Sequence, residues 1–390
     1  MNEKKFRRRL QRYPAIADLR ELTQRRLPKI SWEYLDCGTG DEQGVRKNIN
    51  KMAQVSFLPK FMKGDLKPKL KTKIFGTNYD LPFGIAPVGL TGLMWPKAEL
   101  ILAKTALEYK IPFCLSTVAT QKPEVVGPIS GDVGWFQLYP PRKPEIRNNL
   151  IKRAEKSGFK TLVVTADVPV GSRRERTSRA GLETPPRITP GFLYEAFKHP
   201  TWTIQTLLNG LPKLRTIEQY VGSKKMGEVA SYVGQELGGT LSWDYLREVR
   251  DLWKGPLVLK GILEPDDADK AISIGVDGIQ VSNHGARQFD GTPAAIDVLP
   301  VIADAVGGRA KILFDSGVRT GLDILRALAL GADFVFLGRP FLYGVCAFGK
   351  SGGSHTIEIL KADLETNLIN LGCDNLNELP QPVFEKIILR

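Results

Sequence analysis

The sequence predicts an α/β protein, a closed (β/α)8 TIM barrel with a helical extension before it and a long insertion after its fourth strand. Eight short apolar runs alternate with amphipathic stretches, and the runs are continuously apolar, as in parallel strands covered on both faces. A doubly wound open sheet is the alternative that this alternation leaves open. The runs occupy residues 83–88, 113–118, 134–139, 161–167, 257–262, 278–283, 311–317 and 334–340.

The spacing of these runs predicts the domain organisation. Most strand starts lie 20 to 35 residues apart, but the fourth and fifth are 96 apart, so we expect an insertion at 176–240. We expect a single domain over 1–390, with an extension at 1–80, the barrel at 81–372 and a tail at 373–390. Helical periodicity, in several cases closed by glycine, covers residues 97–110, 144–158, 265–275 and 321–331.

The positive charge is concentrated at the N-terminus. The chain carries a formal net charge of +13, and residues 1–73 hold 19 Lys and Arg against 8 Asp and Glu. A solvated basic surface and attraction to an anionic membrane or an acidic partner both fit this distribution. Nucleic acid is not expected as a partner, because no interleaved aromatic pattern or known binding motif accompanies the charge.

The sequence contains no apolar run long enough to cross a membrane, and its basic start is not followed by the apolar core of a signal peptide. We therefore expect a cytoplasmic protein, with peripheral attachment to the inner face of the cytoplasmic membrane as an alternative. The four cysteines form no CxxC pair and no ligand cluster with the three histidines, so we expect free thiols and no metal.

Polar residues and glycines follow the predicted strands, at the barrel end where enzymes of this fold build their sites. Two motifs, DSGVRTG at 315–321 and LGRP at 337–340, close strands seven and eight, the usual phosphate-binding corner. No P-loop and no GxGxxG after a strand is present. The residues after the strands are Gly89, Ser116, Gln137, Tyr139, Thr165, Asp167, Lys260, His284, Arg287, Asp315, Arg319, Gly338 and Arg339.

The sixth strand is followed by SNHGARQFDG, residues 282–291. A histidine suits proton abstraction near neutral pH, and an arginine nearby offers a bidentate fork for a carboxylate. His284 and Arg287 therefore predict a base beside a carboxylate clamp, and hence an acid as substrate.

Together these motifs resemble those of the FMN-dependent L-2-hydroxy acid oxidase and dehydrogenase family. The resemblance covers nearly the whole chain, and SNHGARQ is that family's signature. The other matching motifs are LPKISWEYLDCG (27–38), IAPVGLTGLMWP (85–96), CLSTVAT (114–120), WFQLYP (135–140), VVTADVPVGSRRER (163–176), VLKGIL (258–263), DSGVRTG and LGRP.

The resemblance implies roles for individual residues and FMN as cofactor. It implies that His284 is the base, Asp167 its orienting partner, and Arg287 and Arg174 the contacts of the substrate carboxylate, with Tyr34 and Tyr139 as hydroxyl donors. Pro87, Val88 and Gly89 would lie against the flavin ring, Ser116, Gln137 and Thr165 would bond its polar edge, and Lys260 would face N1 and O2. Ribityl and phosphate would be held by Asp315, Gly317, Arg319, Gly338 and Arg339.

The chemistry agrees with these roles, because oxidation of a 2-hydroxy acid needs a base, an electron sink and positive charge beside the reduced flavin. Two roles of His284 stay open: it takes the hydroxyl proton during hydride transfer, or the α-proton to give a carbanion.

The resemblance also bears on substrate and electron acceptor. Glycolate oxidase has tryptophan at Val118, so a pocket for side chains larger than hydrogen is implied. The family's oxidases mostly carry alanine at Gly89, whereas its respiratory lactate and mandelate dehydrogenases carry glycine. We therefore expect oxidation of L-lactate or a mandelate-like acid, with electrons passed to quinone or another non-oxygen acceptor, by a homo-oligomer, commonly a tetramer in this family. An oxidase that releases hydrogen peroxide is one alternative, and a non-catalytic basic barrel that binds nucleic acid or an acidic partner is another.

Overall fold

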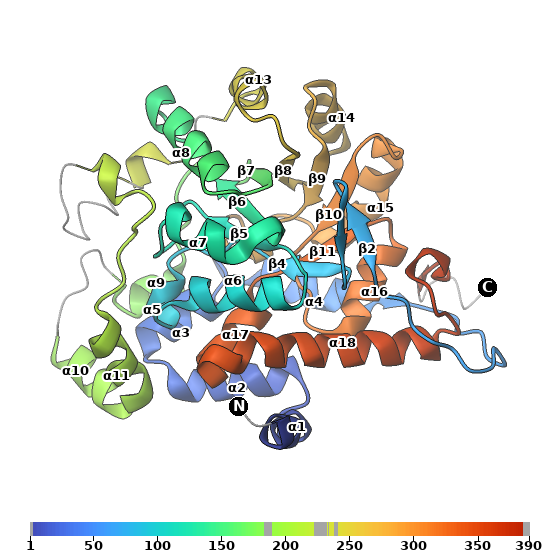
Figure 1. The fold of residues 1–390 in the computed structure, drawn as a ribbon, viewed down its shortest axis with the longest axis horizontal. Helices are drawn as coiled ribbons and strands as arrows, with labels where there is room; N and C mark the ends of the chain where they lie inside the picture. The colour runs from blue at the N-terminus through green and yellow to red at the C-terminus, as the bar shows by residue number, and fades with distance from the viewer. Residues whose placement is uncertain (1–2, 183–188, 222–231, 233, 238–240, 385–390) are drawn as a thin grey trace.

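The computed structural model describes residues 3–182, 189–221, 232, 234–237 and 241–384, and its centre is a closed barrel of parallel strands (Figure 1). The strands follow one another around the barrel in chain order, and β11 closes it by pairing with β4. This closure confirms the predicted (β/α)8 barrel, and the alternative prediction of an open doubly wound sheet was wrong. The strands are β4 (Phe83–Ile85), β5 (Phe113–Ser116), β6 (Gly134–Leu138), β7 (Thr161–Thr165), β8 (Leu257–Ile262), β9 (Gly278–Val281), β10 (Lys311–Phe314) and β11 (Phe334–Leu337).

Helices cover the outside of this barrel. The four helices predicted from periodicity are present as α6 (Ala98–Glu108), α8 (Pro144–Lys156), α14 (Pro265–Ser273) and α16 (Gly321–Ala329). Helix α17, which the sequence analysis did not find, is buried along most of its length, so its sequence carries no polar face to reveal the period. The helices found only in the structure are α7 (Pro123–Ser130), α13 (Trp243–Leu252), α15 (Ala295–Val306), α17 (Arg339–Phe348) and α18 (Gly352–Asn370).

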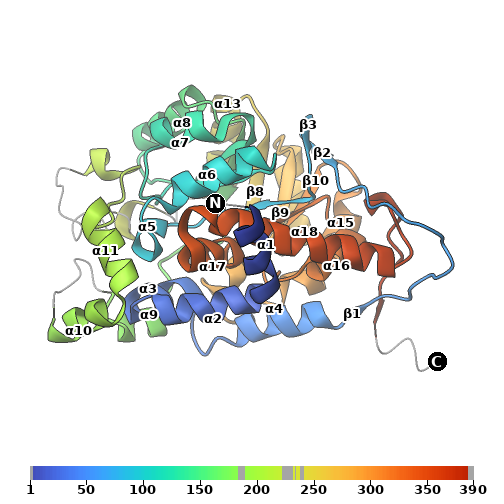
Figure 2. The same cartoon turned by 60° about the horizontal axis from the view of Figure 1, so that its bottom comes forward.

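The chain before the barrel is helical and runs along one side of it (Figure 2). Helix α2 packs against α17, and α4 packs against the short helix η3 (His284–Ala286), which follows β9. Strand β1 (Val55–Ser56) pairs antiparallel with β12 (Val383–Phe384), so the end of the N-terminal helical segment lies beside the C-terminal end of the described chain. The helices are α1 (Glu3–Arg12), α2 (Ile16–Arg26), α3 (Lys29–Asp36) and α4 (Gln43–Ala53).

A hairpin closes the amino-terminal end of the barrel. Strands β2 (Thr72–Ile74) and β3 (Thr77–Tyr79) are joined by Phe75 and Gly76, both with positive φ, as in a two-residue hairpin turn. The ring centroid of Phe75 lies 5.7 Å from that of Trp135 on β6. A Cβ on Gly278 would lie 2.8 Å from the Phe75 ring, so glycine at that position leaves the space that the Phe75 side chain occupies.

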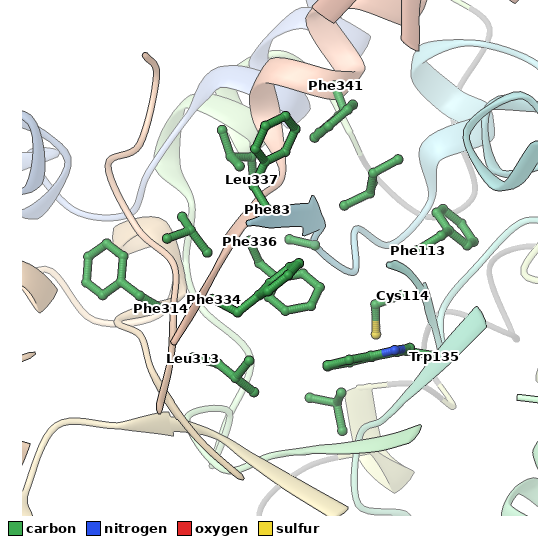
Figure 3. Close-up of a cluster of buried hydrophobic side chains, with 14 of the residues drawn as sticks. Phe83, Phe113, Cys114, Trp135, Leu313, Phe314, Phe334, Phe336, Leu337 and Phe341 are labelled. Atoms are coloured by element: carbon green, nitrogen blue, oxygen red, sulfur yellow. The ribbon is translucent and has the colours of Figure 1, made fainter. Parts of the chain in front are cut away.

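Aromatic side chains fill the barrel interior (Figure 3). The rings of Phe336 and Trp135 lie 5.1 Å apart, and those of Phe334 and Phe336 lie 5.6 Å apart. Gly84 pairs with Phe336 in the barrel, and a Cβ there would lie 3.0 Å from that ring. The interior of the barrel is therefore a packed core and not an open channel.

Between β7 and β8 the chain leaves the barrel. This segment contains α9 (Glu175–Arg179), α10 (Pro190–Lys198), α11 (Pro200–Asn209) and the short helix η2 (Glu218–Tyr220), and the rest of the expected insertion at 183–188, 222–231, 233 and 238–240 lies outside the described residues. Helices α10 and α11 form a hairpin at one side of the molecule (Figure 1). Among the described residues no helix has the length and apolarity needed to cross a bilayer.

The packed interior predicts a large difference between two Phe→Ala substitutions. Phe334 is fully buried, so Phe334→Ala is expected to lower the free energy of unfolding by about 3–5 kcal/mol. Phe61 is 73% exposed, so Phe61→Ala should change it by less than about 0.5 kcal/mol. Denaturant unfolding followed by tryptophan fluorescence measures both, and equal losses would contradict the proposed core.

Candidate active site

A cavity of about 500 Å³ opens at the carboxyl ends of the barrel strands. This is the end at which TIM-barrel enzymes place their sites, because each strand is followed there by a loop. Every strand of the barrel contributes to its wall, through Pro87, Val118, Gln137, Thr165, Lys260, His284, Asp315 and Gly338.

The residues that the sequence singled out meet at this cavity. Ser116 and Asp167 lie directly behind its wall: the Ser116 hydroxyl donates to Gln137 Oε1 at 3.0 Å, and Asp167 contacts His284. Those that line the cavity are Tyr34, Pro87, Val88, Gly89, Gln137, Tyr139, Thr165, Arg174, Lys260, His284, Arg287, Asp315, Gly317, Arg319, Gly338 and Arg339.

His284 is bonded at both ring nitrogens. Its Nδ1 lies 2.9 Å from Oδ1 of Asp167, and its Nε2 lies 3.3 Å from the hydroxyl of Tyr139. Because an ionised carboxylate only accepts hydrogen bonds, Nδ1 carries the proton and Nε2 presents a lone pair to the cavity. This tautomer is the one required of a base at Nε2.

The backbone at His284 is unusual. His284, Gly285 and Ala286 all have left-handed φ values, of 58°, 61° and 57°. Residues other than glycine rarely adopt this conformation, and such strain gathers at functional sites. The turn that ends β9 therefore aims the imidazole in a direction that an ordinary strand end would not give.

A bulge in β8 brings Asp167 close to the histidine. The pairing of β8 with β9 shifts register between Lys260 and Ile262, and Gly261 has a φ of 98°. A Cβ on Gly261 would lie 2.5 Å from Cγ of Asp167. Only glycine fits there, so the VLKGIL motif encodes both the lysine and the space for the carboxylate.

Burial and nearby charges keep His284 neutral. Burial is the largest influence and lowers the pKa of His284, the charges of Lys260 and Arg174 lower it further, and Asp167 opposes them. Burial alone would raise the pKa of Asp167, but the charges of His284 and Lys260 hold it below the usual aspartate value. At neutral pH the pair is thus an uncharged imidazole beside a carboxylate.

Lys260 supplies a fixed positive charge in the wall of the cavity. It is 4% exposed, and its Nζ donates to the Ser282 hydroxyl at 2.8 Å and lies 3.4 Å from Asp315 and 4.0 Å from Asp167. Burial alone would lower the pKa of Lys260, but the two carboxylates raise it above the usual lysine value. The ammonium group is therefore charged throughout the physiological pH range.

Two arginines, Arg174 and Arg287, line the cavity together with His284. Arg287 donates to the carbonyl oxygens of Cys37 at 2.7 Å and Tyr34 at 2.8 Å, which lie at the end of α3. Burial, together with the charges of Arg174 and Arg339, lowers the pKa of Arg287 to about 10. Arg174 donates to the Ser172 hydroxyl at 2.8 Å. The mutual repulsion of these cations favours a bound anion.

A second pair of arginines lies at the ends of β10 and β11. Arg339, in the first turn of α17, donates to the carbonyl oxygens of Cys37 at 2.8 Å and Gly285 at 3.2 Å. Arg319 donates to its neighbour Val318, and burial lowers its pKa. Within the described ranges, none of the four arginines forms an ion pair with a carboxylate. Cations left in this state suit a phosphate group, as FMN carries.

The wall of the cavity also carries an amide, a hydroxyl and a glycine at which no side chain fits. Gln137 donates to the Thr165 hydroxyl at 2.9 Å, which sets its amide along the wall. A Cβ on Gly89 would lie 2.4 Å from Cγ2 of Val118, so the chain there has no room for a side chain. The volume of the cavity, the amide and hydroxyl groups on its wall and the arginines that line it therefore fit FMN.

Some residues of the site were missed by sequence reasoning. Ser282 accepts from Lys260, and its hydroxyl donates to Asp315 at 2.6 Å, so it links two residues that were found. Gln280 also donates to Asp315, at 2.6 Å. Alternating polar residues within the otherwise apolar run GIQVSN were the available signal.

Comparison with known proteins agrees with this geometry. A family model described as FMN-dependent dehydrogenase matches residues 23–386. An L-lactate dehydrogenase of Ectopseudomonas mendocina (strain ymp) is 37% identical over 374 residues, which cover 95% of this chain and 98% of that protein.

Solved structures with the same fold include both dehydrogenases and oxidases. The crystal structure of the monotopic membrane protein (S)-mandelate dehydrogenase matches with a TM-score of 0.91 and 35% identity, covering 95% of this chain and 99% of that one. A mandelate oxidase matches with a TM-score of 0.81 and 30% identity, covering 96% and 98%.

The family match spans most of the chain, and the described residues form a cavity suited to its cofactor. The protein is therefore an FMN-dependent oxidoreductase, and the alternative of a non-catalytic basic barrel was wrong. By sequence, by fold and by the residues at its cavity, this chain belongs to the FMN-dependent dehydrogenase family.

Proposed function

We propose that this flavoprotein oxidises an L-2-hydroxy acid of the lactate or mandelate class to the 2-oxo acid and passes the electrons to quinone or another non-oxygen acceptor. One observation carries the proposal: the unprotonated Nε2 of a neutral histidine faces the same cavity as two arginines that, among the described residues, have no carboxylate partner. A base next to a carboxylate site is what a hydroxy acid requires.

Arg287 and Arg174 bind the substrate carboxylate. Their guanidinium groups repel each other, and a bound carboxylate relieves that repulsion. The hydroxyls of Tyr34 and Tyr139 line the same region and orient the substrate hydroxyl. Val118 lines the cavity with a short side chain, which leaves room for a substituent on the α-carbon.

His284 accepts a proton from the substrate at Nε2. Conversion of a hydroxy acid to an oxo acid removes two protons and two electrons: His284 accepts one proton, both electrons would pass to FMN, and the second proton would pass to FMN or to solvent. The imidazolium that forms is stabilised by Asp167, 2.9 Å from Nδ1. The hydroxyl of Tyr139 lies 3.3 Å from Nε2, so the substrate group that gives up the proton would lie beside this hydroxyl.

FMN, when bound, supplies the acceptor for the two electrons. Lys260 would place a positive charge beside its ring, and Gln137 and Thr165 would bond the polar edge of the ring. Arg319, Arg339 and the turns at Gly317 and Gly338 would hold the phosphate. Asp315 fixes the lysine from below, at 3.4 Å.

The acceptor is inferred from the resemblance and the surface. Both dehydrogenases and oxidases resemble this chain, so the fold alone favours neither. The glycine at Gly89, which the resemblance associates with the dehydrogenases, favours a non-oxygen acceptor. By the same resemblance we propose a homo-oligomer, with a tetramer as the expected state.

Helices α10 and α11 form an apolar surface that suits contact with a membrane, where quinone dissolves. Trp202 anchors the hairpin, because its buried indole donates to the Leu93 carbonyl at 3.0 Å. Exposed apolar side chains of this density mark an interaction surface. The exposed residues are Leu193, Tyr194, Phe197, Ile204, Leu207, Leu208 and Leu211, each 54–84% exposed. The dehydrogenase with the same fold is itself a monotopic membrane protein.

The proposed reaction predicts that L-lactate or L-mandelate bleaches the flavin absorbance of the purified protein in the absence of oxygen. The His284→Ala variant should still bind FMN, but the rate of this bleaching should fall by a factor of about 10² or more, because no base remains. His199→Ala, between α10 and α11, is the matched control and should bleach normally. Turnover with a soluble quinone compared with hydrogen peroxide release identifies the acceptor. Bleaching by His284→Ala at the normal rate would refute the assigned base.

The pKa shifts predict the pH dependence of kcat/KM. Activity should fall on acidification as His284 becomes protonated, with a midpoint below the ordinary histidine pKa because burial lowers it. Asp167→Asn removes the charge that raises this pKa, so the acidic limb should move to lower pH, and the maximum rate should fall about 10²-fold or more. Asp269→Asn, at a surface ion pair with Arg309, should leave the profile unchanged. A shift of the Asp167→Asn limb to higher pH would contradict this assignment.

The apolar hairpin predicts reversible binding to anionic vesicles. Replacing Leu207 and Leu208 by aspartate should weaken co-sedimentation at least about tenfold, since each buried leucine contributes roughly 1.5–3 kcal/mol. Turnover with a soluble acceptor should stay normal. Val301→Asp and Ile369→Asp together, at exposed apolar positions on α15 and α18, form the control pair and should bind as the wild type. Equal binding by both double variants would exclude the hairpin as the contact.

A further inference from the structure

The turn that carries His284 is attached to α4 through side chains with no part in the proposed reaction. Asn48 of α4 and Asn283, next to His284, are 2% and 4% exposed. Each amide donates to the oxygen of the other, both at 2.8 Å. This reciprocal pair joins a helix of the N-terminal extension to the residue that precedes the base.

The amide pair also holds the chain on both sides of the turn. Asn283 Oδ1 accepts from the backbone N–H of Ala286 at 3.2 Å, and its Nδ2 donates to the Pro293 carbonyl at 3.1 Å. Asn48 Oδ1 accepts from the backbone N–H of Ala295, at the start of α15, at 3.3 Å. One buried contact thus spans the three left-handed residues His284, Gly285 and Ala286.

A second attachment lies at the start of α4. Asp290, from the same loop as His284, accepts from the backbone N–H groups of Gly44 at 2.7 Å and Gln43 at 3.1 Å. A Cβ on Gly44 would lie 2.8 Å from Cβ of Ala286, so the helix and the turn are in close contact. The loop 282–291 therefore clasps α4 at two points one helical turn apart.

We propose that Asn48 is a positioning residue that, with Asp290, holds the His284 turn in its left-handed conformation and so aims Nε2 at the substrate. The inference rests on the proposed role of His284 as base. Left-handed conformations at His284 and Ala286 are unfavourable by themselves, so surrounding contacts have to maintain them. Asn48 lies outside the loop and bonds to the side chain of the residue next to the base, whereas Ser316, also outside the loop, accepts only from the backbone N–H groups of Asn283 and Gly285.

Asn48→Asp distinguishes positioning from a general loss of stability. The variant has the same shape, but an ionised carboxylate has no donor for Asn283 Oδ1 and places two acceptors face to face. Once protonated, the carboxyl regains a donor. The flavin reduction rate of the variant relative to wild type should therefore recover as the pH falls, whereas Asn48→Ala should lower that ratio equally at every pH.

The experiment follows anaerobic reduction of the FMN-loaded enzyme by saturating L-lactate or L-mandelate, whichever the wild type uses, from pH 6 to 9. Burial of the new carboxyl opposite the acceptor Asn283 Oδ1 raises its pKa above the usual aspartate value, by as much as about 3–5 units for a fully buried group, so it titrates in this pH range. For Asn48→Asp we therefore expect a rate about tenfold below wild type at pH 9 and within about threefold at pH 6, the size of one buried hydrogen bond. KM and FMN content should change less than the rate. Asn367→Ala, which removes an amide bonded to Asp363 on α18, is the control and should match wild type.

Two results would overturn the inference: an Asn48→Ala rate within twofold of wild type, or an Asn48→Asp ratio that does not vary with pH. If Asn48→Ala does not fold, the isosteric Asn48→Asp variant carries the test alone. Failure of the proposed function has a different signature, because His284→Ala would then still be reduced. Loss of reduction in His284→Ala with normal Asn48 variants would refute only the role of Asn48.

Discussion

The hydrogen bond between His284 and Asp167 is the interaction on which the rest of the site depends. The cavity gathers Lys260 and several arginines, and burial together with the charges of Lys260 and Arg174 lowers the pKa of His284. Asp167 supplies the opposing charge at 2.9 Å, and the bulge at Gly261 gives it the space to do so. The base can therefore be neutral before the reaction and charged after it, within a strongly cationic environment.

The cations also explain why helices outside the barrel belong to the active site. Arg287 and Arg339 both donate to the carbonyl of Cys37, which caps α3. The end of a helix carries a partial negative charge, so it holds guanidinium groups without neutralising them as a carboxylate would. Both arginines thus keep their charge for a ligand, which we propose is the substrate carboxylate for Arg287 and the FMN phosphate for Arg339. A barrel without α3 would lack this arrangement.

Much of the fold and most of the site could be predicted from the sequence. The barrel strands are short apolar runs followed by polar residues or glycines, and that pattern places these residues on one rim in any parallel barrel. Contacts between distant segments left no such local signal. The Asn48–Asn283 pair joins residues 235 positions apart, and Asn48 lies in a helix whose sequence gives no sign of its partner. The buried helix α17 was missed because burial on most sides removes the amphipathic period.

The topology of the insertion connects the proposed membrane surface to the chemistry. The chain leaves the barrel after β7, at the rim that carries the cavity, so α10 and α11 are built outward from the side where the flavin would lie. Trp202 bonds to the carbonyl of Leu93, which also accepts from the Ser31 hydroxyl of α3 at 2.8 Å. Leu93 belongs to α5 (Thr91–Met94), directly after the Gly89 turn. A lipid surface that binds the hairpin would thus be held by a short chain of contacts to the wall of the cofactor site, which suits an acceptor that arrives from the membrane.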